Sequence, residues 1–123
     1  MPATTDRLVW IDCEMTGLDL AVDELVEVAV VVTDFDLTPV HDGFSIVIKP
    51  GRSAWNGMGD FVRAMHAESG LADEVPDGVS LADAEYAVLE YILEHVPTAQ
   101  HAPLAGNTIG TDRAFLAKFM PRV

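Results

Sequence analysis

The sequence has 123 residues, of which 50% are hydrophobic, and this length is enough for one core. Seven Lys and Arg against 20 Asp and Glu give a net charge of −13. Without a basic cluster, the chain is not suited to bind long nucleic acid, although simple solubility explains the charge equally well. No apolar run reaches the ~18 residues that cross a bilayer, and no signal peptide is visible, so we expect a cytoplasmic protein without membrane contact.

The first predicted strand, residues 8–11, is fully apolar and runs into two carboxylates, Asp12 and Glu14. Residues two apart on a strand point to the same side, which places their Cα atoms roughly 6.5 Å apart. A hard cation such as Mg²⁺ or Mn²⁺ would relieve their repulsion. A pair of solvated acids is the plainer interpretation of such a pattern. The apolar strand and the turn at Gly17 favour a metal site instead.

Two further strands are predicted at residues 25–33 and 44–48, and short polar turns join all three strands into an antiparallel meander. Cys13 faces away from Asp12 and Glu14, so we expect a small buried hydrophobic residue rather than a reactive thiol. Glu27 lies inside the second strand and needs a partner there. We favour a structural role for it, because isolated buried acids more often hold loops than perform chemistry.

Helical spacing begins after the third strand. Apolar residues recur three and four apart from 58 to 69, which predicts an amphipathic helix that ends at Gly70. Residues 73–78 are predicted as a loop, and Ser80 opens a second helix that ends at Pro97. A short strand near residues 103–106 and a helix at 113–120 follow, with Asp112 in the turn between them. His66 is more simply a cation at a helix C-terminus than a ligand contact.

Three segments resemble the oligoribonuclease family, within the DEDD superfamily of 3′→5′ exonucleases. They are WIDCEMTGL at residues 10–18, MxxFxxxxHxxSGL at 58–71 and GNTIGTDRAFL at 106–116. The resemblance implies an α/β fold of the ribonuclease H-like type, with a mixed sheet and helices on both faces. It also implies a single exonuclease domain over residues 1–123 whose C-terminal part is missing.

By this resemblance, the intact protein is an exoribonuclease that releases 5′-mononucleotides from the 3′ end of short RNA. The absence of a basic track suggests substrates of about two to five nucleotides. Asp12, Glu14 and Asp112 would be the catalytic residues. They would also bind two divalent ions, Mg²⁺ or Mn²⁺, which lie about 3.5–4 Å apart in such sites.

The resemblance also assigns substrate contacts and an assembly. Leu18 matches a leucine that inserts between two bases, and Phe61 stands where the family often has a stacking Trp. His66 matches a histidine of the substrate pocket, which replaces the plainer interpretation above. Thr108 would offer its hydroxyl to a terminal phosphate. The intact protein is expected to be a homodimer.

The third motif of the family, a general-base His followed by a fourth metal-binding Asp, is absent from these 123 residues. His95 and His101 precede Asp112 and cannot substitute for it. The sequence is therefore interpreted as the first two-thirds of an oligoribonuclease, and this part alone is expected to be inactive.

Two other interpretations remain open. In a haloacid-dehalogenase-like phosphatase, Asp12 would be the nucleophile and the acid two residues on would be the general acid. That acid is Glu14 rather than Asp, and Lys118, inside the last predicted helix, is a poor candidate for the phosphate-binding Lys. The remaining alternative is a non-catalytic acidic chain that folds and binds metal weakly.

Overall fold

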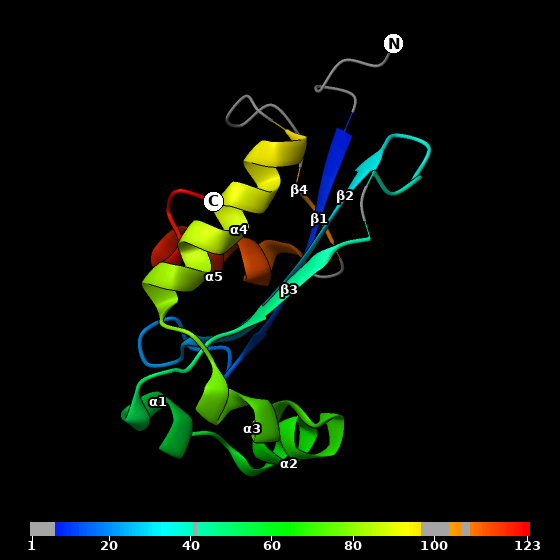
Figure 1. The fold of residues 1–123 in the computed structure, drawn as a ribbon. Helices are drawn as coiled ribbons and strands as arrows, with labels where there is room; N and C mark the ends of the chain where they lie inside the picture. The colour runs from blue at the N-terminus through cyan, green and yellow to red at the C-terminus, as the bar shows by residue number, and fades with distance from the viewer. Residues whose placement is uncertain (1–6, 41, 97–103, 107–108) are drawn as a thin grey trace.

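The computed structural model describes residues 7–40, 42–96, 104–106 and 109–123, which form an α/β fold around a sheet of order β3-β2-β1-β4 (Figure 1). β1 (Arg7–Met15), β2 (Leu25–Asp34) and β3 (Phe44–Val47) are antiparallel neighbours, whereas β4 (Leu104–Ala105) runs parallel to β1. The predicted α/β class, the mixed sheet and the meander of three strands are confirmed.

β1 is longer than predicted and contains both acids. It continues past Ile11 to Met15 because β2 pairs with it throughout, with Asp12 opposite Ala29 and Glu14 opposite Glu27. Strand alternation divides its residues between two faces. Val9, Ile11, Cys13 and Met15 are buried on one face, so the prediction of a buried Cys13 is confirmed.

Two helices cover that apolar face. α4 (Leu81–His95) contributes Ala84, Val88 and Tyr91 to the same core as Val9 and Ile11, and α5 (Ile109–Phe119) contributes Phe115 and Leu116. Figure 1 shows both helices on one side of the sheet. Helices were predicted on both faces. In the described part of the chain, the opposite face carries the half-buried or exposed side chains of Trp10, Asp12, Ala29 and Val31, and helical residues between 65 and 74 lie beside its Glu14 and Glu27.

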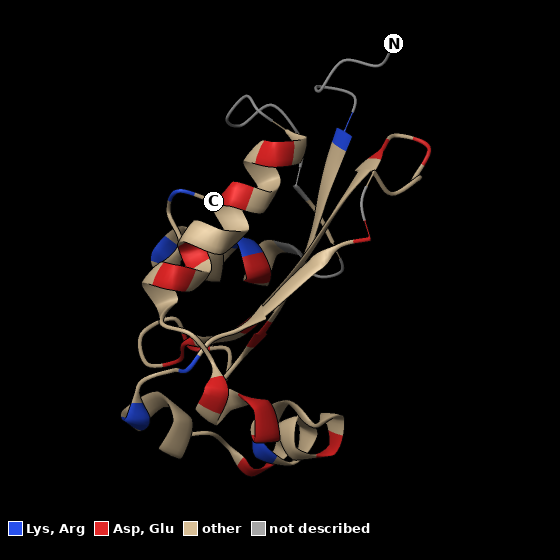
Figure 2. Ribbon diagram, viewed as in Figure 1, with Lys and Arg blue, Asp and Glu red and all other residues tan. Residues whose placement is uncertain are grey.

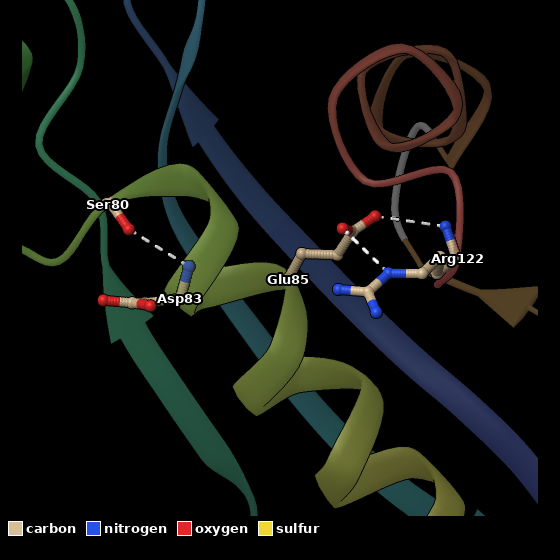
Figure 3. Close-up of polar contacts among 4 residues, drawn as sticks. All are labelled: Ser80, Asp83, Glu85 and Arg122. Atoms are coloured by element: carbon tan, nitrogen blue, oxygen red, sulfur yellow. Dashed lines mark hydrogen bonds and ion pairs between the residues drawn. The ribbon is translucent and has the colours of Figure 1, made fainter.

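Two side-chain contacts stabilise the first part of α4. The Oγ of Ser80 accepts a hydrogen bond of 3.1 Å from the backbone N–H of Asp83, as the predicted N-cap requires (Figure 3). Further along α4, the carboxylate of Glu85 accepts two hydrogen bonds of 3.1 Å from the backbone and Nε of Arg122. This ion pair ties the segment after α5 to α4.

Short helices pack at one end of the sheet (Figure 1). They are α1 (Arg52–Asn56), α2 (Asp60–Ser69), α3 (Leu71–Glu74) and the 3₁₀ helix η2 (Val75–Asp77), and Leu71 and Val75 pack on Val26 of β2. α2 ends at Gly70, whose φ of 86° is left-handed, as predicted. α1 and α3 were not predicted, because one turn of helix carries too little periodicity to detect. No helix in the described ranges is long and apolar enough to cross a membrane.

The loop after β1 is held by one carboxylate. Asp23 accepts a hydrogen bond of 2.8 Å from the hydroxyl of Thr16 and one of 2.9 Å from the backbone N–H of Asp19. A Cβ at Gly17 would lie 2.4 Å from Asp23 Oδ2, so the close approach requires glycine at this position. The loop that presents Leu18 is therefore constrained at both of its ends.

We predict that Gly17→Ala lowers the free energy of unfolding by about 1–3 kcal/mol, because the added methyl group displaces the Asp23 carboxylate. In an Asp23→Ala background the same change should cost much less, since the clashing atoms are gone. Urea unfolding of the two single variants and the double variant measures the coupling. Asp36→Ala is the matched control, because the described hydrogen bonds include none to that side chain. Additive costs of the two changes would contradict the prediction.

Candidate active site

Three acids from two distant parts of the sequence lie near the inner strand β1. Asp12 and Glu14 project from the open face of β1, where Asp12 is exposed and Glu14 is half-buried. Asp112, only 6% exposed, lies in the first turn of α5. The carboxylate of Asp112 accepts a hydrogen bond from the backbone N–H of Cys13, the residue between the two β1 acids.

The secondary structure at Asp112 differs from the prediction. The sequence placed it in a turn before a helix at residues 113–120, but α5 begins at Ile109, so Asp112 is already helical. An acid in the first turn complements the helix dipole, which also favours its position there. The packing of Phe115 and Leu116 into the core fixes α5 against β1 and brings Asp112 to Cys13.

Burial and neighbouring charges raise the pKa of two of the acids, Glu14 and Asp112. Burial raises the pKa of Glu14, the charge of Asp12 raises it further, and the nearby His66 opposes the shift. Burial also raises the pKa of Asp112, the Cys13 amide opposes that shift, and Asp12 adds to it. The pKa of the Cys13 thiol is raised above its usual range, first by burial and then by the acids, so Cys13 stays protonated and is a poor nucleophile.

This donor set is chemically suited to a hard divalent cation. Carboxylate oxygens are the ligands that Mg²⁺ and Mn²⁺ prefer, and a cation would offset the repulsion that adds to the effect of burial on the two pKa values. Among the described residues, however, no three Asp, Glu, His or Cys side chains are grouped closely enough to hold a metal ion. The carboxylates interact electrostatically without converging on one point.

A second acid pair extends this region. Glu14 and Glu27, opposite each other on β1 and β2, line a cavity of about 170 Å³ together with Met65, His66 and Glu74. Burial raises the pKa of Glu27, and the charges of Glu14 and Glu74 add to the shift. Sequence reasoning favoured a loop-holding role for Glu27. The signal that it belongs to the acidic region was its position as the one charged residue within an apolar strand.

His66 connects this cavity to the end of β1. It is 1% exposed, and its Nε2 donates a hydrogen bond of 2.7 Å to the carbonyl oxygen of Met15. Its ring stacks on Trp55, with centroids 6.5 Å apart and an angle of 8° between the planes. His66 is thus buried and hydrogen-bonded, and it also lines a cavity beside Glu14.

Two of the predicted substrate contacts, Leu18 and Phe61, are large exposed side chains. Leu18 is 77% exposed in the loop after β1, and Phe61 is 82% exposed in the first turn of α2. Met65, one turn later on α2, is 41% exposed and was not singled out from the sequence. Thr108 lies outside the described residues.

Comparison with known proteins identifies the family. A family model described as Exonuclease matches residues 9–123. The oligoribonuclease of Leifsonia xyli subsp. xyli is 69% identical over the whole chain, which covers 59% of that protein. The oligoribonuclease of Streptomyces griseus is 56% identical over 115 residues, which are 94% of this chain and 57% of that one. The chain thus spans a little over half the length of these relatives, close to the two-thirds expected from the sequence.

Solved structures show the same fold. A zinc-bound complex of Escherichia coli exonuclease I with single-stranded DNA has a TM-score of 0.72 at 14% identity, over 94% of this chain and 24% of that one. Exonuclease I from Methylocaldum szegediense has a TM-score of 0.65 at 21% identity, over 91% of this chain and 23% of that one. These similarities confirm the ribonuclease H-like exonuclease fold. With the family model matched from residue 9 to residue 123, the chain belongs to the exonuclease family.

Proposed function

We propose that the chain supplies the Asp12, Glu14 and Asp112 part of a 3′→5′ exoribonuclease active site that acts on very short RNA. The observation that carries the proposal is the proximity of these three acids along β1, where burial and then neighbouring charge raise the pKa of Glu14 and Asp112. The names of the two relatives described above, both oligoribonucleases, support the RNA substrate.

The acids would hold two divalent ions, Mg²⁺ or Mn²⁺. When bound, such ions activate water and stabilise a leaving oxygen in phosphodiester hydrolysis. Asp112 is 6% exposed, and its hydrogen bond from the Cys13 amide would orient it for this role. Burial raises the pKa of Glu14, next to the His66 cavity, and a bound cation would favour its charged form.

Leu18 and Phe61 would contact the bases. Their exposed apolar side chains can pack on the face of any base, which gives binding without sequence preference. His66 would shape the pocket through its bond to Met15 rather than enter it freely, and Thr108 would hold the terminal phosphate. The intact protein would be a cytoplasmic homodimer.

A phosphatase of the haloacid-dehalogenase type is the alternative, with Asp12 as nucleophile. The family match favours the nuclease. Trapping of an aspartyl-phosphate at Asp12 would reverse this preference.

The activity can be tested in an extended protein, in which residues 1–123 are followed by the part of the Leifsonia xyli relative that this chain does not cover. We expect rapid hydrolysis of a dinucleotide and poor hydrolysis of a thirty-nucleotide RNA, because the chain offers no basic track to hold a long strand. EDTA should abolish the activity, and Mn²⁺ or Mg²⁺ should restore it. Equal turnover of both RNAs would refute the substrate class, and activity in EDTA would refute the metal requirement.

Asp112→Asn in the extended protein should lower the rate by at least ~10²-fold, because one negative charge is lost from the cation site.

Without metal, the same change should keep or raise the melting temperature, since it removes a buried charge. The raised pKa of Asp112 determines whether the stability of the wild type rises or falls with pH. Wild type loses stability as the pH rises from 3.8, the ordinary value, through the higher folded value, so the advantage of the variant should appear at neutral pH and shrink toward pH 3.8. Asp36→Asn serves as the control. A clear fall in metal-free stability would show that Asp112 is structural.

Residues 1–123 expressed alone should show at least ~10²-fold less dinucleotide cleavage than the extended protein. No His follows Asp112 in this sequence, and a positioned general base typically contributes about 10²–10⁴-fold. Assay of both proteins with Mn²⁺, beside the complete Leifsonia xyli oligoribonuclease, measures the difference. Cleavage within tenfold of the extended protein would mean that the general base lies within these 123 residues.

A further inference from the structure

A second cavity, larger than the one beside Glu14, lies among the short helices. Its volume is about 450 Å³, and its walls come from the connection between β3 and α1, from α1 itself, and from α3 and η2. This volume falls within the range of about 300–1,000 Å³ that is typical of small-molecule sites. No residue lines both this cavity and the one that contains Glu14 and His66, so the two are separate.

The charge of the cavity is opposite to that of the chain. Its only charged lining residues are Lys49 and Arg52, two of the seven Lys and Arg in a sequence with 20 acids. Figure 2 shows these basic segments at the beginning of α1 and just before it. Among the described contacts, neither side chain forms an ion pair. The carboxylate of Glu24 lies nearby, but it accepts a hydrogen bond of 2.9 Å from the backbone N–H of Gly51.

An aromatic ring stands beside these cations. Arg52 and Trp55 are three residues apart on α1 and so lie on neighbouring positions of one helix face. Trp55 lines the cavity and also stacks on the buried ring of His66, which restricts the motion of the indole. Val75 and Pro76 of η2 complete the apolar wall.

The wall is held in place before any ligand arrives. Arg63 of α2 donates hydrogen bonds of 3.3 and 3.1 Å to the carbonyl oxygens of Trp55 and Asn56, at the end of α1. Arg63 therefore caps α1 and leaves the amide of Asn56, which also lines the cavity, available as donor and acceptor. A preformed site loses less entropy on binding.

We propose that this cavity binds a nucleoside 5′-monophosphate. The phosphate would lie between Lys49 and Arg52, whose charges and N–H groups suit a phosphate dianion. The base would stack on the indole of Trp55, and Asn56 would hydrogen-bond its edge. Binding requires no metal ion, and the inference is independent of the proposed nuclease activity.

The test is calorimetric titration of the 123-residue protein with adenosine 5′-monophosphate in EDTA. Under these conditions the acids at β1 repel phosphate, so only the basic cavity should bind. We expect saturable binding at one site, with inorganic phosphate and adenosine each at least ~10-fold weaker because each probe keeps only half of the contacts. The double variant Lys49→Gln/Arg52→Gln should weaken binding by at least ~10-fold, and Trp55→Leu should weaken binding of the nucleotide but not of phosphate.

The matched control is Lys118→Gln/Arg122→Gln, which removes the same two charges from the C-terminal end of the chain and should leave the affinity unchanged. Equal weakening by both double variants would show a general charge effect and overturn the proposal. Equal affinity for phosphate alone would reduce the site to an anion site without base recognition. Binding that appears only after Mn²⁺ is added would place the nucleotide at Asp12, Glu14 and Asp112; that result would refute this inference and leave the proposed function intact.

Discussion

The antiparallel pairing of β1 with β2 is the constraint on which the rest of the structure depends. It fixes which β1 side chains enter the core, and a shift of one residue would exchange the two faces. Because Val9, Ile11 and Cys13 must be buried beneath α4 and α5, Asp12 and Glu14 are forced to the opposite face. The same register sets Glu27 across from Glu14 and so concentrates negative charge at one end of the sheet.

This concentration of acids opposes folding, and core packing offsets it. Burying carboxylates beside one another raises the pKa of Glu14, Glu27 and Asp112, which is an unfavourable environment for the charged forms. Phe115 and Leu116 pack on the sheet and hold α5 where Asp112 must lie. A site that is costly without a cation and supported by a rigid apolar layer is typical of metal-dependent chemistry.

The short helices add a basic cavity to a protein that is otherwise acidic. α2 and the helices around it place His66 and Trp55 in one stack, so that a buried ring on the acidic side contacts the aromatic wall of the basic cavity. Two of the seven basic residues flank this cavity (Figure 2). Opposite local charges on the two sides of one aromatic pair would let the protein bind a cation and an anion independently.

Sequence periodicity determined the three strands, α2, α4 and the alternation that puts Asp12 and Glu14 together, because these signals are local. The three family motifs identified the exonuclease family for the same reason. Tertiary structure alone decided how far β1 extends, since its last residues are held by β2 rather than by their own propensity. It also decided the start of α5, the hydrogen bond from Cys13 to Asp112, and the basic cavity between α1 and η2. Each of these depends on packing between segments far apart in the chain, which no local pattern records.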